Sequence, residues 1–142
     1  MPTEDKSGLS RQALELWASQ STAATGEVFG PGYVNHQEPD VKGEVSDQDL
    51  AEYEELLAGY HSAFSESEVT VVMQVAEGDL VASRWSFTAT NTGDYLGRPA
   101  TGVRATWTGI QIDRHEGGRI VESWVDWDKF RLLAQLGFVE QP

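Results

Sequence analysis

The feature that most constrains the fold is a change in hydrophobic period near Glu68. Before it, apolar residues recur every three or four positions, as along one face of a helix, whereas beyond it they alternate with polar residues, as in a half-buried strand. The alternation continues to about residue 125, so the sequence predicts helices first and a sheet after them. This order is typical of an α+β domain whose helices pack on one face of the sheet.

Four strands are predicted to form an antiparallel meander, because short turns or a single loop join them in succession. Their ranges are 69–76, 80–90, 103–114 and 119–125. Gly78 turns the first hairpin, and Glu116, Gly117 and Gly118 turn the last one. The segment 92–102, with three glycines and Pro99, is predicted as a flexible loop between the second and third strands.

Helices are predicted on both sides of these strands. One covers about 9–19, with Ser7 or Ser10 as its N-cap, and a short last helix covers 128–137. Another begins at Ser46 or Asp47, and its apolar face consists of Leu50, Tyr53, Leu57, Tyr60 and Phe64. Residues 37–68 carry ten acidic residues and one lysine, a charge run that is typical of the solvated face of such a helix.

Length and charge limit what the chain can bind. Its 142 residues suit one domain, spanning 1–142, with a single core. Ten basic against 23 acidic residues give a net charge of −13, which disfavours nucleic acid and anionic membranes as partners. The absence of cysteine excludes thiol catalysis and cysteine-based zinc sites. The N-terminus lacks the apolar stretch of a signal peptide, so we expect a cytoplasmic protein.

Sequence patterns for cofactor or metal chemistry are missing from the chain. It has no phosphate-binding glycine loop, no nucleophile elbow and no metal-ligand spacing of the HExxH type. The histidines, at positions 36, 61 and 115, lie far apart in different predicted elements. We therefore expect neither a cofactor nor a bound metal.

Tryptophans dominate the predicted strands. Trp85, Trp107 and Trp124 occur near the centres of successive strands, where a curved sheet either buries them in a core or places them around one apolar cavity. Such a cavity would suit a neutral, planar aromatic small molecule. Arg84 is interpreted either as half of a surface ion pair or as an inward cation that binds a substrate oxygen.

Carboxylates follow Trp124 in the same alternation. An acid held beside tryptophans has a raised pKa, which suits proton transfer. Asp128 fits this role, and it equally fits the N-cap of the last helix. Asp126 is expected to be an exposed residue at the end of the strand. His36 is interpreted either as an ordinary loop residue after a GPG turn or as a residue of the site.

Longer motifs resemble one protein family. The stretch GGRIVESWVDWDKFRLLAQLG (117–137) resembles the C-terminal signature of the SnoaL-like polyketide cyclases, matching it at Gly118, Arg119, Ile120, Glu122, Trp124, Asp128, Gln135, Leu136 and Gly137. Upstream, YLGRPATGVRATWTGIQIDR (95–114) is similar to the family's Gly-x-Pro-x-Thr-Gly loop and the strand after it. EGDLVASRW (77–85) fits its hairpin, and VFGPGYVNHQ (28–37) is similar to the segment that carries a Tyr-x-x-His.

The resemblance implies a nuclear-transport-factor-2-like cone, in which a strongly curved antiparallel sheet wraps around a pocket that the N-terminal helices close. It also implies a homodimer. It assigns the acid/base aspartate to Asp128 and the pocket histidine to His36, while Tyr33 and His61 join the tryptophans and Arg84 as expected substrate contacts. The segment STAATGEVFGPG departs from the family, because the second helix looks truncated there.

The resemblance further implies a cofactor-independent acid/base enzyme of anthracycline-type aromatic polyketide antibiotic biosynthesis. Its reaction would close a ring by intramolecular aldol condensation. One alternative is a hydroxylase that acts on the polyketide ring system in the same type of pathway. Another is a non-catalytic module that only holds a small molecule, in which case Asp128 is simply a helix cap. The motifs do not separate these functions, since one fold hosts many of them.

Overall fold

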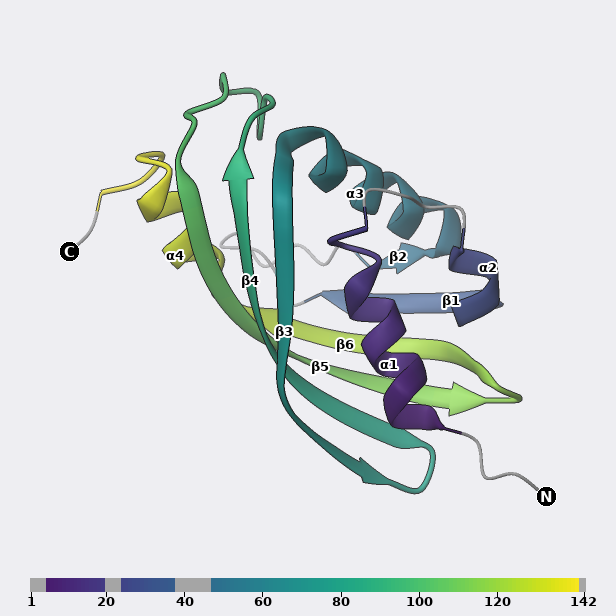
Figure 1. Cartoon of the computed structure of the whole chain (residues 1–142). Coiled ribbons are helices and arrows are strands. Elements are labelled where there is room, and N and C mark those ends of the chain that lie inside the picture. The colour runs from purple at the N-terminus through teal and green to yellow at the C-terminus, as the bar shows by residue number, and fades with distance from the viewer. Residues whose placement is uncertain (1–4, 20–23, 38–46, 141–142) are drawn as a thin grey trace.

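The computed structural model describes residues 5–19, 24–37 and 47–140, which form four helices and six strands. The helices are α1 (Lys6–Glu15), α2 (Thr25–Val28), α3 (Leu50–Ala63) and α4 (Lys129–Gln135). The strands are β1 (Phe29–Gln37), β2 (Gln48–Asp49), β3 (Phe64–Glu77), β4 (Leu80–Asn91), β5 (Arg104–Glu116) and β6 (Arg119–Trp127). All six belong to one open sheet in the order β2-β1-β6-β5-β4-β3, which confirms the predicted α+β class (Figure 1).

The last four strands form the predicted antiparallel meander. β3 pairs with β4, β4 with β5, and β5 with β6. Glycines make both tight turns because they tolerate positive φ angles, which are +60° at Gly78, +60° at Gly117 and +78° at Gly118. The segment 92–102 lies between strands, as expected. β3 starts earlier than the alternation indicated, at Phe64, which pairs with the last residue of β4.

Strand β1 is an element that the sequence patterns did not predict. The GPG stretch was expected to be a turn, yet the chain is extended from Phe29 to Gln37 and pairs with β6 in parallel. The register of this pairing shifts between Phe29 and Val34, around Pro31, which has no amide hydrogen to donate to the ladder. The two-residue strand β2 then pairs antiparallel with β1. Among the described strand pairs, only β1 with β6 is parallel.

Helix α1 has a different cap from the one expected. Its N-cap is Asp5, whose carboxylate accepts a hydrogen bond from the Gly8 amide at 2.8 Å. Ser7 and Ser10, which the sequence indicated, lie within the helix. An acidic N-cap suits the positive end of the helix dipole.

Helix α3 starts later than expected, at a capping box. Asp49 accepts from the amide of Glu52 at 2.8 Å, and the Glu52 carboxylate accepts from the amide of Asp49 at 3.2 Å. Asp47 therefore lies outside the helix, and Ser46 lies outside the described residues. Tyr53 and Leu57 of the predicted apolar face are buried, which agrees with the helical period.

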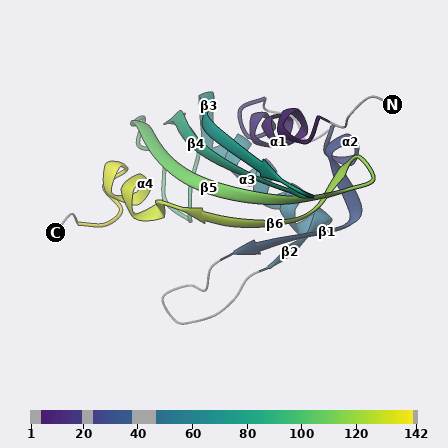
Figure 2. The same cartoon turned by 90° about the horizontal axis from the view of Figure 1, so that it is seen from below.

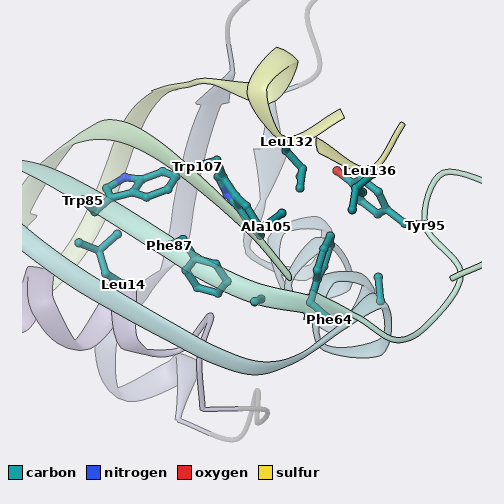
Figure 3. Close-up of a cluster of buried hydrophobic side chains, with 11 residues drawn as sticks. Leu14, Phe64, Trp85, Phe87, Tyr95, Ala105, Trp107, Leu132 and Leu136 are labelled. Atoms are coloured by element: carbon teal, nitrogen blue, oxygen red, sulfur yellow. The ribbon is translucent and has the colours of Figure 1, made fainter. Parts of the chain in front are cut away.

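The sheet is strongly curved, and α1 and α3 lie against its inner face (Figures 1 and 2). The buried core has two parts. One cluster joins aromatic side chains of β3, β4 and β5 to Leu132 and Leu136 at the C-terminal end of the chain (Figure 3). The other packs α1 and α3 onto β1 around Phe29, Tyr33 and Tyr53. The helices thus cover the sheet without filling the space in its curve.

Candidate functional site

The inner face of the sheet encloses a cavity of about 590 Å³. Every described strand contributes to its wall, and so does every described helix except α2. The described lining residues are Leu14, Trp17, Asn35, Gln37, Gln48, Tyr53, Leu56, Tyr60, Val69, Trp85, Phe87, Trp107, Gln111, Val125, Asp126, Trp127, Lys129 and Leu133. Its size suits a small organic ligand.

One half of the cavity is aromatic, because neighbouring strands present large rings side by side. Phe87 of β4 pairs with Trp107 of β5, and their ring centroids lie 5.0 Å apart. In the next row, Trp85 and Trp127 flank Gly109, which pairs with both. Gly109 is required there, since a Cβ at this position would overlap the Trp85 ring and lie 2.8 Å from Cβ of Trp127. Figure 3 shows the Trp85, Phe87 and Trp107 rings gathered on the same side of these strands.

The other half of the cavity is polar and mostly uncharged. The row beyond the tryptophans contains Gln37, Val125 and Gln111 from β1, β6 and β5, all of which line the cavity. The next row contains Asn35, Ser123 and Asp113 on the same three strands. Amides therefore line this end of the cavity, and the acid Asp113 is buried beside them.

Asp113 is the buried carboxylate behind this wall. It has no exposed surface, and its Oδ1 accepts hydrogen bonds from Ser123 Oγ at 2.6 Å and Gln111 Nε2 at 2.8 Å. Burial raises the pKa of Asp113, and the bonds from Ser123 and Gln111 oppose part of that increase. None of the described side chains forms a hydrogen bond with its Oδ2.

Charged residues lie at the rim of the cavity. Asp126 and Lys129 are exposed residues of its rim. The Asp126 side chain alternates with those of the lining residues Val125 and Trp127, so it lies on the outer side of β6. Asp128 is an exposed residue between the lining residues Trp127 and Lys129, and it is not itself among the described lining residues. Its Oδ1 accepts from the amide of Arg131 at 2.9 Å, so the helix-capping role is present, while no described residue bonds to its Oδ2.

His36 lies on the outer face of the sheet, opposite the cavity. Its neighbours Asn35 and Gln37 line the cavity, so the side chain between them points the other way. Its Nδ1 lies 3.0 Å from Asp47 Oδ2 and its Nε2 lies 2.7 Å from Glu122 Oε2. Because carboxylates only accept, both nitrogens donate, and these partners, chiefly Glu122, raise the pKa of His36.

The remaining predicted contacts also lie apart from the cavity. Trp124 is 39% exposed and stacks on the His36 ring, with 5.4 Å between ring centroids, so the structure separates it from Trp85 and Trp107. Arg84 is exposed on β4. Tyr33 is buried in the second core cluster, where burial raises its pKa, and His61 Nε2 donates to the carbonyl of Leu16 at 2.7 Å.

Several lining residues were not expected from the sequence. Trp127 lies three positions after Trp124, and this odd spacing places the two tryptophans on opposite faces of β6. Gln111 lies four positions after Trp107, and this even spacing places both on the inner face of β5. Strand phase therefore places Gln111 on the face of Trp107, and it shows that Trp124 and Trp127 cannot both face the cavity. Asn35, Gln37 and Gln48 could not be found in this way, because they belong to strands that the patterns missed.

Two further classes of feature are absent from the part of the chain that the structure describes. No group of three or more acidic or histidine side chains there is arranged to hold a metal ion. None of the described helices has the length and apolar character needed to cross a membrane.

Comparisons with known proteins agree with this geometry. The family model described as SnoaL-like polyketide cyclase matches residues 8–136. AclR, a proposed hydroxylase from Streptomyces galilaeus, superposes with a TM-score of 0.84 at 25% identity, covering 97% of this chain and 84% of AclR. IdmH, a proposed polyketide cyclase from Streptomyces antibioticus, superposes with a TM-score of 0.80 at 28% identity, covering 94% of this chain and 99% of IdmH.

A third solved structure is similar over nearly its full length. A proposed polyketide cyclase from Acidithiobacillus ferrooxidans has a TM-score of 0.78 at 26% identity, covering 96% of this chain and 98% of that one. No curated protein matches the chain. The match over residues 8–136 and the shared fold confirm the family that the sequence motifs indicated. The chain therefore belongs to the SnoaL-like polyketide cyclase family.

Proposed function

We propose that the protein is a cofactor-independent acid/base enzyme that closes a ring of an aromatic polyketide by intramolecular aldol condensation. The observation that carries this proposal is the two-part cavity. Trp85, Phe87, Trp107 and Trp127 form flat apolar walls for fused rings, and amides at the other end suit the oxygen substituents of such a molecule. The match to the SnoaL-like polyketide cyclase family supports the same reaction class.

The proposed reaction needs one proton acceptor. Asp128 takes a proton from a substrate carbon between two carbonyl groups, and the resulting enolate carbon attacks another carbonyl of the same molecule. A carbon–carbon bond forms, the attacked carbonyl becomes an alkoxide, and Asp128 returns the proton to that oxygen. No atom is gained or lost overall, so no cofactor is consumed. Asp128 adjoins the cavity through Trp127, and its Oδ2 has no bond to any described residue.

Asp128→Asn tests this assignment. Asparagine caps helices as well as aspartate, so the bond to the Arg131 amide and the stability of α4 should survive. Turnover should fall by about 100-fold or more, because general acid–base contributions are of that order. Cyclisation of an anthracycline-type polyketide methyl ester by the purified protein, without added cofactor, is the measurement.

Asp126→Asn is the matched control, since Asp126 is another exposed carboxylate at the rim and is a lining residue. We expect a smaller loss of turnover in this variant. If Asp126→Asn abolishes cyclisation and Asp128→Asn does not, Asp126 is the acid/base residue. If the wild-type protein binds the ester and forms no product under any condition, the protein is a binding module and Asp128 is a helix cap.

A hydroxylase is the second candidate function. The specific observation in its favour is the likeness to AclR, a proposed hydroxylase, with a TM-score of 0.84. The same assay separates the two reactions. Product that appears only when oxygen and a reductant are supplied indicates a hydroxylase, whereas product in their absence indicates a cyclase.

A further inference from the structure

The polar end of the cavity is built so that an amide is held from behind. Gln111 is 4% exposed and lines the cavity, and its Nε2 donates to Asp113 Oδ1 at 2.8 Å. Asp113 also accepts from Ser123 Oγ through the same oxygen. Ser123 of β6 and Gln111 of β5 thus fix the position of the Asp113 carboxylate, and the carboxylate in turn fixes the orientation of the Gln111 amide.

The direction of the Gln111 bond decides which amide atom is left for a ligand. An oxygen of Asp113 that already accepts from Ser123 can bind the NH₂ group of Gln111 and not its carbonyl. The carbonyl oxygen Oε1 is therefore turned away from Asp113, and no residue in the described ranges donates to it. Oε1 is therefore a hydrogen-bond acceptor that is free at this point of the wall.

Asn35 repeats the same arrangement on β1. It also lines the cavity, and its Nδ2 donates to Gln48 Oε1 at 2.9 Å. Its carbonyl oxygen Oδ1 has no partner among the described residues. Each of these two amides therefore uses one N–H within the protein, while its carbonyl oxygen accepts from no described residue. The Asn35 oxygen is buried without a partner, which is costly, so a ligand that supplies a donor to it gains by pairing it.

We infer that Asp113 is a positioning residue, which holds the Gln111 carbonyl toward the cavity so that this end selects ligands carrying a hydroxyl hydrogen. The ligand group is a phenol or an enol rather than its methyl ether, because an ether oxygen meets an acceptor with no hydrogen between them. The inference rests on the proposed function, since it takes an aromatic polyketide-like ligand as the occupant of the aromatic half.

A pair of probes tests the selection. 2-Hydroxyanthraquinone and 2-methoxyanthraquinone differ by a methyl group in place of the hydroxyl hydrogen. Their binding is followed by quenching of the tryptophans that line the cavity, at a slightly acidic pH that keeps the phenol protonated. We expect the wild-type protein to prefer the hydroxyl compound by about tenfold, which is the size of one net hydrogen bond.

Three variants separate positioning from mere stability. Asp113→Ala frees the Gln111 amide, so the preference should fall to about threefold or less. Asp113→Asn keeps an acceptor for both Ser123 and Gln111, and we expect it to retain the wild-type preference. Gln111→Met removes the carbonyl that is proposed to accept the ligand's hydrogen bond and leaves Asp113 unmutated. This variant keeps the test valid even if Asp113→Ala fails to fold. A general loss of packing would weaken both probes alike and leave their ratio unchanged.

The outcomes distinguish the inference from the function on which it rests. Equal wild-type affinity for both probes contradicts the hydroxyl selection, and a preference that survives in Gln111→Met contradicts its assignment to Gln111 and Asp113; the aromatic site stands in both cases. Linear, unsaturable quenching by both probes contradicts the aromatic ligand of the proposed function, and the inference fails with it.

Discussion

At the scale of single residues, His36 and Glu122 form a charge-assisted link between β1 and β6 on the outer face. Glu122 binds His36 Nε2 through one oxygen and Arg114 Nε through the other, at 2.7 Å and 3.0 Å. The pKa of Glu122 is lowered, mainly by His36, and the pKa of His36 is raised, mainly by Glu122. β1 and β6 form the parallel strand pair, and no tight turn joins them. This link therefore helps to fix the register between the two strands.

The link predicts a window of pH dependence. Because the pKa of His36 is raised on folding, its contribution to the free energy of unfolding is fully present below the unfolded-state pKa of 6.5. That contribution is lost as pH rises through the folded-state pKa. Because the pKa of Glu122 is lowered on folding, its contribution to the free energy of unfolding is lost as pH falls through its folded-state pKa. We predict that His36→Gln lowers the free energy of unfolding between these two limits and that the difference from wild type closes at alkaline pH. Urea denaturation across a pH series measures it.

Glu122→Gln provides the control for this prediction. Because Glu122 is the main cause of the shift, the NMR-monitored pKa of His36 should return toward 6.5 in this variant. A difference between wild type and His36→Gln that stays constant across pH would show that the ring acts by packing on Trp124 and not by charge.

At the scale of elements, the cavity depends on a gap in β5 that only glycine leaves. Gly109→Ala places a methyl group against Trp85 and Trp127, so we predict a loss of stability of about 1–3 kcal/mol and weaker binding of aromatic ligands. Gly59→Ala is the matched control, since nothing lies within 4 Å of its added Cβ in α3. That change should stabilise the protein by up to about 1 kcal/mol. Thermal unfolding of both variants decides, and equal effects would contradict the role of Gly109.

Elements also show how far the sequence could predict this molecule. The meander strands were predictable because each pairs with its chain neighbour and alternates along 69–125. β1 was not, because GPG interrupts its alternation and its partner β6 lies far along the chain. The amides of β1 and β2 were missed for the same reason. Trp124 was grouped with Trp85 and Trp107 because position within a strand does not reveal which face a residue occupies.

At the scale of the whole molecule, the outer face of the sheet is unusually apolar for an exposed surface. Val75, Ala82, Ile112 and Trp124 form one cross-strand row, and Met73, Arg84, Ile110 and Asp126 form the next. Exposure is 64% at Val75, 58% at Met73 and 44% at Ile110. Contiguous exposed apolar side chains of this kind mark interaction surfaces. The second row also carries opposite charges on the two sides of Ile110.

This face predicts a two-fold symmetric dimer. A two-fold axis parallel to β5 would place Arg84 of one copy opposite Asp126 of the other while the apolar rows cover each other, and such self-complementarity is what a symmetric interface requires. Light scattering at micromolar concentration should therefore give twice the chain mass of 15.6 kDa.

Ile112→Glu should give the monomer, because it buries an unpaired charge at the centre of the interface. Leu96→Glu, at a more exposed leucine in the 92–102 loop, should leave the dimer intact. A wild-type mass near 15.6 kDa, or dissociation by Leu96→Glu and not by Ile112→Glu, would refute this interface.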